Sequence, residues 1–264
     1  MKLQIHRIFM SLVLTSLTDI PLIIPGDDLA AIIGRALELN RIHLEDGDIM
    51  VLAQKIVSKS ENRLVNLNDV SPSSAAQDLA QITNKDARFI ELVLRESKAV
   101  LRAKGGTLIV EHRRGFICAN AGIDHSNVQG AWGNPEDWVL LLPENPDQSA
   151  NKIRKNLEAI TGVNLGVSII DSHGRAWRNG VVGTSIGFSG IPGLVDMRGK
   201  PDLFGYELRI TTIAAADELA AAASLMMGQA NEKTPVVHVR GFPYPLRESD
   251  LTELIRPKEQ DLFR

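Results

Sequence analysis

The chain has 264 residues, of which 44% are hydrophobic and 23% charged, and its formal net charge at pH 7 is −3. This composition indicates a soluble globular protein with a sizeable core, built as one large domain or two small lobes, and excludes a disordered chain. The net negative charge argues against nucleic acid as the main partner, because binding a phosphate backbone needs a clustered basic surface. Cys118 is the single cysteine. It excludes an internal disulfide framework and a cysteine-built metal site, which fits a reducing cytoplasm.

The N-terminus begins as a signal peptide does, with Lys2 and Arg7 ahead of an apolar stretch, but no small-x-small cleavage site follows. That apolar run is too short to span a bilayer, and no other stretch is long and apolar enough for a membrane helix. We therefore expect no membrane partner. The first core strand is expected to begin near Met10, with residues 1–9 as a loose extension. Met10 as the true start is the alternative.

Strands and helices alternate along the rest of the chain. Asp27 and Asp28 are N-cap candidates for a first helix, whose apolar residues recur at helical spacing. A buried strand over 49–53 is followed by a polar turn with Lys55 and Lys59, and then by a second strand. The later elements are expected in this order: a helix opened by Ser71-Pro72, a helix over 86–96, strands over 107–111 and 116–119, a helix over 149–160 ended by Gly162, a strand ending at Asp171, an Ala-rich helix ending near Gly228, and a strand over 235–241.

This order predicts a mixed α/β content without the strict βαβ repeat of a doubly wound sheet, so we expect an α+β fold with mixed sheets. No internal repeat or low-complexity segment is present. A Pro-rich connector near residues 143–150 is the best candidate for a boundary between two lobes. The whole chain, 1–264, is expected to form one functional module.

Two predicted strands lead into an aspartate, Asp124 in "NAGID" and Asp171 in "GVSIID". Carboxylates followed by Gly-rich turns suit a hard divalent cation such as Mg²⁺ or Mn²⁺, which accepts few carboxylates, water and phosphate oxygens. The alternative is that each Asp caps a turn through its side chain. The occurrence of both favours a metal. Ser172 adds a further oxygen next to Asp171.

Several other motifs are less informative. "DSHGR" is not a catalytic triad, because neighbouring residues of an extended chain point in opposite directions, so His173 is expected in a turn or on the surface. Lys55, Lys59 and Arg63 could meet phosphate, or could lie on a solvated hairpin. "GVVGTSIGFSG" is neither a P-loop nor a dinucleotide fingerprint, and indicates tight turns or close backbone approach. Cys118 has apolar neighbours and is expected in the core.

Several long motifs in a fixed order make a more specific pattern. "IPLIIPGDDLA", "SKSENR", "CANAGIDHSNV", "LLPENPDQSANKIR", "IIDSHGRAWRNGVVGTSIGFSG", "KPDLFGYELRITTIAAADELAAAASLMMGQ" and "PVVHVRG" resemble the coenzyme F420-0:γ-glutamyl ligase family over about residues 14–241. Some members carry a nitroreductase-like second domain, and this chain resembles the single-module form. The resemblance implies a two-lobed monomer within an intertwined homodimer.

The resemblance also implies the site residues. Asp124 and Asp171 fall on metal-ligand positions, with Ser172 beside them and Gln229 on a further metal-ligand position. Lys59 is expected to assist phosphoryl transfer. The positions that contact the nucleotide in the family are occupied here by Ile20, Pro21, Leu22, Ile23, Gln54, Lys55, Lys59, Asn127, Met227, Gly228, Gln229, Ala230 and Asn231.

The activity implied is a GTP-dependent amide ligation that adds L-glutamate to F420-0 through an acyl phosphate. Its cofactors are two divalent ions, Mg²⁺ or Mn²⁺, with a monovalent cation such as K⁺ as a further candidate. The expected partners are GTP, L-glutamate, F420-0 and a second copy of the chain, in the cytoplasm. Two alternatives stay open: a paralogous NTP-dependent carboxylate–amine ligase with another substrate, and a non-catalytic nucleotide-binding protein.

Overall fold

The protein is described by a computed structural model, which covers residues 11–130 and 132–261. The predicted loose extension, residues 1–9, and Met10 lie outside the described residues. The fold is α+β with mixed sheets, as predicted. In the described part of the chain, none of the helices has the length and hydropathy needed to cross a membrane.

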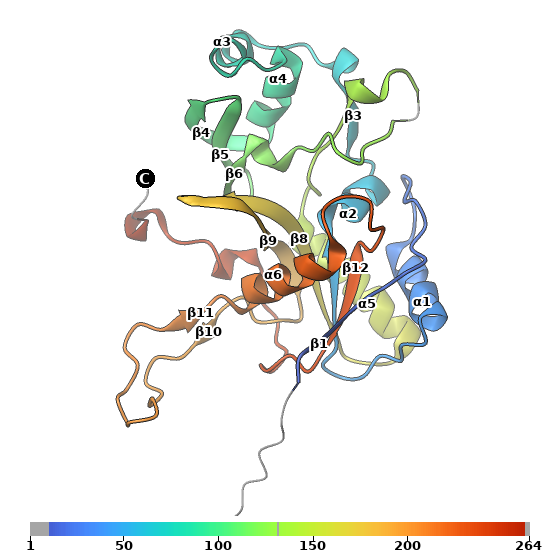
Figure 1. The fold of residues 1–264 in the computed structure, drawn as a ribbon, viewed down its shortest axis with the longest axis vertical. Coiled ribbons are helices and arrows are strands. Elements are labelled where there is room, and N and C mark those ends of the chain that lie inside the picture. The colour runs from blue at the N-terminus through green and yellow to red at the C-terminus, as the bar shows by residue number, and fades with distance from the viewer. Residues whose placement is uncertain (1–10, 131, 262–264) are drawn as a thin grey trace, which may run out of the picture.

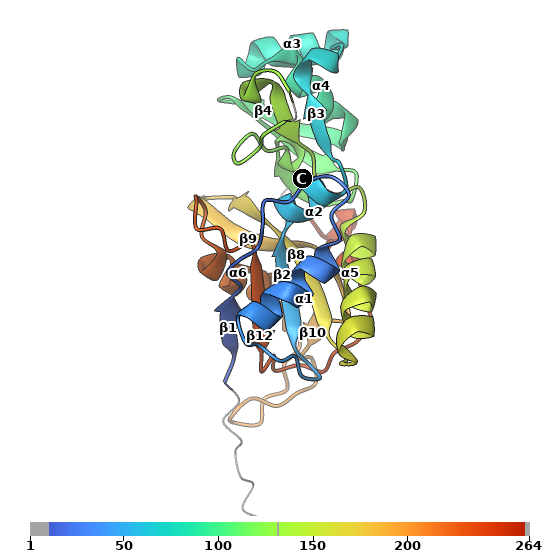
Figure 2. The ribbon, with the colours of Figure 1, turned by 90° about the vertical axis from the view of Figure 1, so that its right-hand side faces the viewer.

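A five-stranded sheet forms the centre of the first lobe, in the order β1-β12-β2-β8-β9 (Figure 1). β2 and β8 are parallel neighbours, while the other three pairs are antiparallel. The helices α1 and α5 cover one face and α6 covers the other (Figures 1 and 2). The bounds of these elements are β1 Val13–Ser16, α1 Leu29–Leu39, β2 Ile49–Ala53, α5 Pro146–Thr161, β8 Gly166–Arg175, β9 Arg178–Ser189, α6 Ala215–Met227 and β12 Val236–Arg240.

Two hydrophobic clusters hold this lobe together, one on each face of the sheet. On the α1/α5 face, Ile33, Ile153 and Leu157 pack against Leu52 and Val167. On the α6 face, alanines and Leu219 of α6 pack against the alternate residues of the same strands. Because both faces are covered, β2 is apolar and buried over nearly its whole length, as the sequence predicted.

The second lobe is inserted between α2 and α5 and has its own core. It lies above the first lobe in Figure 1, on the side where α2 is found. Its elements are β3 Leu64–Asn66, α3 Ser74–Thr83, α4 Ala87–Arg95, β4 Ser97–Lys104, β5 Thr107–His112, β6 Ile117–Ala119 and β7 Trp138–Leu140. The helix α2, Gln54–Ser60, precedes them and packs on the core of the first lobe. The sheets are β4-β5-β6 and β3-β7. Cys118 is buried in this core, as predicted, and burial raises the pKa of its thiol to about 12. The predicted boundary near 143–150 follows β7.

A long arm between β10, Val195–Asp196, and β11, Thr212–Ile213, extends from the first lobe (Figure 1). Several of its large apolar side chains are almost fully exposed, with exposed fractions of 97% for Leu203, 95% for Phe204 and 88% for Ile210. An apolar surface of this kind on a projecting segment is typical of an interaction site.

Four local predictions were wrong. The segment carrying Lys55 and Lys59 is the helix α2 and not a polar turn, since Ile56 and Val57 pack into the core. α3 begins at Ser74 and not at Pro72, because the hydroxyl of Ser73 accepts a hydrogen bond from the Ala76 nitrogen and caps the helix. The helix expected from Ser149 begins earlier, at Pro146, after the N-cap Asn145, although it ends at Gly162 as predicted.

The fourth error concerns Asp171 and His173. β8 continues to Arg175, so Asp171 lies within the strand and His173 is a strand residue with a side chain only 11% exposed. By contrast, the Gly-rich segment does make close backbone approaches, as predicted. A Cβ on Gly183 would lie 2.3 Å from the Ala220 carbonyl oxygen of α6, and one on Gly187 would lie 2.4 Å from Pro146 of α5.

Candidate active site

Asp124 reaches the junction between the lobes through a run of left-handed residues. After β6 the chain passes through Asn120, Ala121 and Gly122, whose φ angles are 49°, 54° and 67°. The chain therefore reverses, and the backbone of Asp124 pairs with Leu140, with 3.0 Å between its nitrogen and the Leu140 oxygen. The polar and glycine residues that follow the apolar strand β6 form this turn, and the turn places the Asp124 carboxylate against α2.

The Asp124 carboxylate contacts two side chains of α2. Its Oδ2 accepts a hydrogen bond of 2.6 Å from Gln54 Nε2, and its Oδ1 lies 3.5 Å from Lys55 Nζ. Burial raises the pKa of Asp124 to about 6; Lys55 lowers it, and the charge of Asp171 raises it. The two carboxylates therefore lie close enough for their negative charges to repel each other.

Asp171 comes from β8 of the first lobe, so each lobe supplies one carboxylate. Its Oδ2 lies 3.1 Å from His173 Nε2, two residues along the same face of the strand. Ser172, between them, points to the other face, where its hydroxyl donates to Gln229 Oε1 over 3.0 Å. The structure thus brings Asp124 near Asp171, and Ser172 to Gln229, but the two pairs lie on different faces of β8.

Lys55 and Lys59 lie one turn apart on the same side of α2. Lys55 Nζ donates to the carbonyl and hydroxyl oxygens of Ser126, at 3.1 and 2.8 Å, and Lys59 Nζ donates to the Asn127 carbonyl oxygen at 2.8 Å. Burial lowers the pKa of Lys59, and the charge of Lys55 lowers it further. A phosphate placed between the two ammonium groups would offset their repulsion.

The loop after α6 closes the site on another side. Gly228 ends the helix with φ of 73°, and Asn127 Nδ2 donates to the Ala230 carbonyl oxygen over 3.1 Å. Gln229, Ala230 and Asn231 are exposed, whereas the side chain of Met227, the last residue of α6, is buried in the core between α6 and the sheet. Met227 is therefore available to a ligand through its backbone only.

The segment Ile20 to Ile23 leads into Gly26, which lies at the end of α2. Ile20 and Ile23 pack on the core, Leu22 is 85% exposed, and the Gly26 nitrogen donates to the Ser60 carbonyl oxygen over 2.9 Å. The segment therefore presents a short apolar edge next to the lysine-bearing helix, which suits the face of a planar ring.

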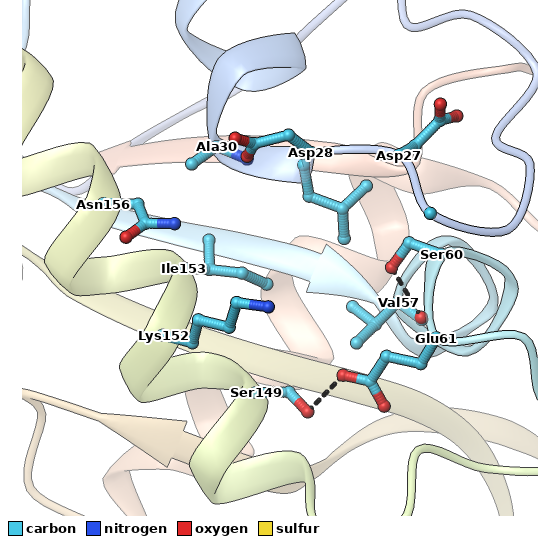
Figure 3. Close-up of a pocket in the computed structure, with 12 residues that line it drawn as sticks. Asp27, Asp28, Ala30, Val57, Ser60, Glu61, Ser149, Lys152, Ile153 and Asn156 are labelled. Atoms are coloured by element: carbon cyan, nitrogen blue, oxygen red, sulfur yellow. Dashed lines mark hydrogen bonds between the residues drawn. The ribbon is translucent and has the colours of Figure 1, made fainter.

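A separate hollow of about 250 Å³ lies between the start of α1, the end of α2 and α5 (Figure 3). Asp28, Glu61 and Lys152 line it, and Glu61 accepts a hydrogen bond from Ser149 (Figure 3). On α2 it is lined by Val57 and Ser60, which are on a different side of the helix from Lys55 and Lys59. This hollow is not part of the candidate site.

The donors present fit a hard divalent cation with open coordination positions. Asp124 and Asp171 supply oxygen ligands of the kind that Mg²⁺ and Mn²⁺ accept, and the rest of the shell stays available to water and phosphate. No group of three or more His, Cys, Asp and Glu side chains with metal-binding geometry exists among the residues that the structure describes. The site therefore does not resemble a closed structural zinc centre.

Reasoning from the sequence missed two residues of this site, Ser58 and Ser126. Ser58 could have been found, because it lies four residues after Gln54, and its hydroxyl donates to Gln54 Oε1 over 2.9 Å. Ser126 reaches Lys55 only through the fold, and no spacing in the sequence indicates that contact.

The fold and site define a class: a two-lobed α+β protein with carboxylates and lysines gathered where the lobes meet. A family model described as F420-0:Gamma-glutamyl ligase matches residues 18–241, and the chain belongs to that family. The chain is 44% identical to the coenzyme F420:L-glutamate ligase of Methanopyrus kandleri, covering 91% of this chain and 92% of that protein. The ligase of the same name from Methanothermobacter thermautotrophicus is 44% identical, covering 97% and 100%. That from Archaeoglobus fulgidus is 41% identical, covering 93% of each.

Proposed function

We propose that the protein is a GTP-dependent amide ligase that joins L-glutamate to F420-0. Family membership supports the ligase activity and the substrate class, because relatives that cover nearly the whole chain are named coenzyme F420:L-glutamate ligase. The observation that carries a phosphate-transfer chemistry is the convergence of Asp124, Asp171, Lys55 and Lys59 at the lobe junction.

The proposed reaction has two displacement steps. In the first, an oxygen of the substrate carboxylate attacks the γ-phosphorus of GTP, the bond to the β-phosphate oxygen breaks, and GDP leaves. In the second, the glutamate amine attacks the acyl-phosphate carbonyl carbon, the carbonyl C–O bond to the phosphate breaks, and inorganic phosphate and a proton leave. Activation is needed because a carboxylate is a poor acyl donor to an amine.

The chain's own residues have distinct parts in this proposal. Lys59 and Lys55 bind phosphate oxygens as compact charges. Asn127 and the loop at Gln229 to Asn231 hold the nucleotide through amide and backbone groups, and the segment 20–23 supports its base. Asp124 and Asp171 would hold Mg²⁺ or Mn²⁺, which supplies charge neutralisation on the phosphates. A second divalent ion and a monovalent cation such as K⁺ belong to the same proposal.

The direct test is incubation of the purified protein with F420-0, L-glutamate, GTP and Mn²⁺, followed by mass spectrometry of the coenzyme. Products carrying added glutamate, formed with GTP and absent without it, are expected. Ligation of glutamate to a different carboxylate, but not to F420-0, would favour a paralogous ligase. Nucleotide binding with no turnover on any carboxylate would favour a non-catalytic nucleotide-binding protein.

The arm between β10 and β11 supports a homodimer as part of this proposal. Leu203, Phe204 and Ile210 are too exposed to be explained by packing within one copy of the chain. A second copy would cover them and exchange the same contact, as two-fold interfaces do. Light scattering should give twice the mass of one chain, and Leu203→Asp together with Phe204→Ser should give the mass of a single chain. An unchanged dimer in that double variant would show that the interface lies elsewhere.

A further inference from the structure

Gln54 is placed to serve the Asp124 carboxylate. The whole residue is only 1% exposed, at the first position of α2. Its Nε2 donates to Asp124 Oδ2 over 2.6 Å, the shortest contact that the carboxylate makes to α2. A residue buried to this extent has little surface left for a nucleotide.

Ser58 holds the oxygen end of the Gln54 amide. The serine is 0% exposed, one turn after Gln54, and its hydroxyl donates to Gln54 Oε1 over 2.9 Å. A side-chain amide has an oxygen end and a nitrogen end of almost the same shape. With the oxygen held by Ser58, the NH₂ group faces Asp124. The reversed amide would place its oxygen against a carboxylate oxygen, and two acceptors at that distance repel each other.

The consequence is a carboxylate with one oxygen bound and the other directed into the site. Oδ2 is committed to Gln54, whereas Oδ1 faces Lys55 Nζ at 3.5 Å. Lys55 also has the two Ser126 oxygens as partners, so it can leave Oδ1 without losing every hydrogen bond. Oδ1 is therefore the oxygen available to a cation that enters the site.

We propose that Ser58 and Gln54 are positioning residues that orient Asp124 for a divalent cation, with Ser58 acting only through Gln54. The inference rests on the proposed function, since it assumes that Asp124 holds Mg²⁺ or Mn²⁺. Residues that hydrogen-bond a metal ligand typically change metal affinity about 10- to 100-fold when removed. The same size of effect is expected here, without any group of α2 touching the metal.

The test measures Mn²⁺ binding to the full chain, in the presence of a non-hydrolysable GTP analogue, by titration calorimetry and by the loss of the free Mn²⁺ electron paramagnetic resonance signal. Ser58→Ala should raise the Mn²⁺ dissociation constant about 10- to 100-fold. Ser58→Thr, which keeps the hydroxyl, should restore most of the affinity. Ser60→Ala is the matched control, because the Ser60 hydroxyl donates to the Val57 carbonyl oxygen and contacts neither Gln54 nor Asp124.

The outcomes separate this inference from the proposed function. If the wild-type protein binds no Mn²⁺, the metal assignment of Asp124 itself fails. If the wild type binds Mn²⁺ and Ser58→Ala binds it equally well, the positioning inference is overturned while the metal site stands. Should Ser58→Ala fail to fold, Gln54→Met provides the second variant, since it keeps the length of the side chain and removes both hydrogen bonds. Equal Mn²⁺ affinity in a folded Gln54→Met protein would likewise overturn the inference.

Discussion

Replacing Lys59 with methionine tests whether this lysine binds phosphate or only holds the loop at Asn127 against α2. Among the described residues, the Lys59 ammonium donates one hydrogen bond, to the Asn127 carbonyl oxygen at 2.8 Å. Its pKa is lowered by burial and by Lys55, so removing it also relieves a repulsion. These two effects on folding oppose each other, and we expect the free energy of unfolding to change by no more than about 1 kcal/mol.

The effect on nucleotide binding should be larger. A hydrogen bond to a charged group contributes about 1.5–3 kcal/mol, which corresponds to roughly ten- to a hundredfold in a dissociation constant. Calorimetry should therefore show GTP binding weakened by at least about tenfold in Lys59→Met, or turnover reduced by a similar factor. Lys59→Arg should not restore the wild-type value, because the planar guanidinium does not replace a compact ammonium.

The matched control is Lys155→Met, an exposed lysine on α5 far along the chain from the site. It should leave unfolding, GTP affinity and ligation unchanged. If Lys59→Met also binds GTP and turns over like the wild type, the assignment of Lys59 to a phosphate is refuted. Its role would then be limited to holding the Asn127 loop against α2.

Three further outcomes are expected. Asp124→Asn and Asp171→Asn should each abolish ligation at ordinary Mn²⁺ concentrations yet keep a cooperative thermal transition, and wild-type turnover in either would remove that residue from the metal site. Gly122→Ala should lower the free energy of unfolding by about 1–3 kcal/mol, because φ is 67° and the new Cβ would lie 2.6 Å from a carbon of Leu142. Gly162→Ala is the control: its φ is 74° but the space around it is open, so it measures the cost of the backbone conformation without the steric clash. Burial lowers the pKa of His112 from 6.5 to about 4, so the unfolded chain takes up the proton before the folded one does. The free energy of unfolding should therefore fall by up to about 3 kcal/mol as the pH drops from 6.5 to about 4, and an equally steep fall in His112→Asn would disprove the assignment to His112.

The parts of the fold that could be predicted are those with a long, regular pattern. α1 carries apolar residues at helical spacing after the N-cap Asp28, and α6 is a long Ala-rich run that ends at Gly228. β2 and β12 are nearly continuous apolar runs of strand length. In α2 the pattern failed, because seven residues with only two aliphatic side chains give too short a run to show a period of 3.6. The charges of Lys55 and Lys59 then indicated a solvated turn.

The continuation of β8 past Asp171 was missed for a related reason. Beyond that point the strand pairs with β9 as a hairpin whose outer residues, such as Gly174 and Arg175, are exposed on both faces. A strand with no buried face has no alternation of apolar and polar residues to detect. The residue types at the site were nevertheless predictable, whereas the pairing of Asp124 with Gln54 depends on a left-handed turn that no spacing reveals.

The division of the site between two lobes makes their relative position a determinant of its chemistry. Arg63, where the chain enters the second lobe, donates through Nε to the carbonyl oxygen of Leu142, where the chain returns, over 2.9 Å. The same guanidinium contacts Glu96 at 3.1 Å, and Glu96 also binds Arg113 at 2.8 Å. Hydrogen bonds to charged groups contribute about 1.5–3 kcal/mol each, so a rotation that opens the junction must break several such contacts at once. The two crossings of the chain are thereby held together. Asp124 belongs to the second lobe, whereas α2 packs on the core of the first lobe through Ile56 and Val57. The distance between the Asp124 carboxylate and the lysines of α2 is therefore maintained by a network that touches none of them.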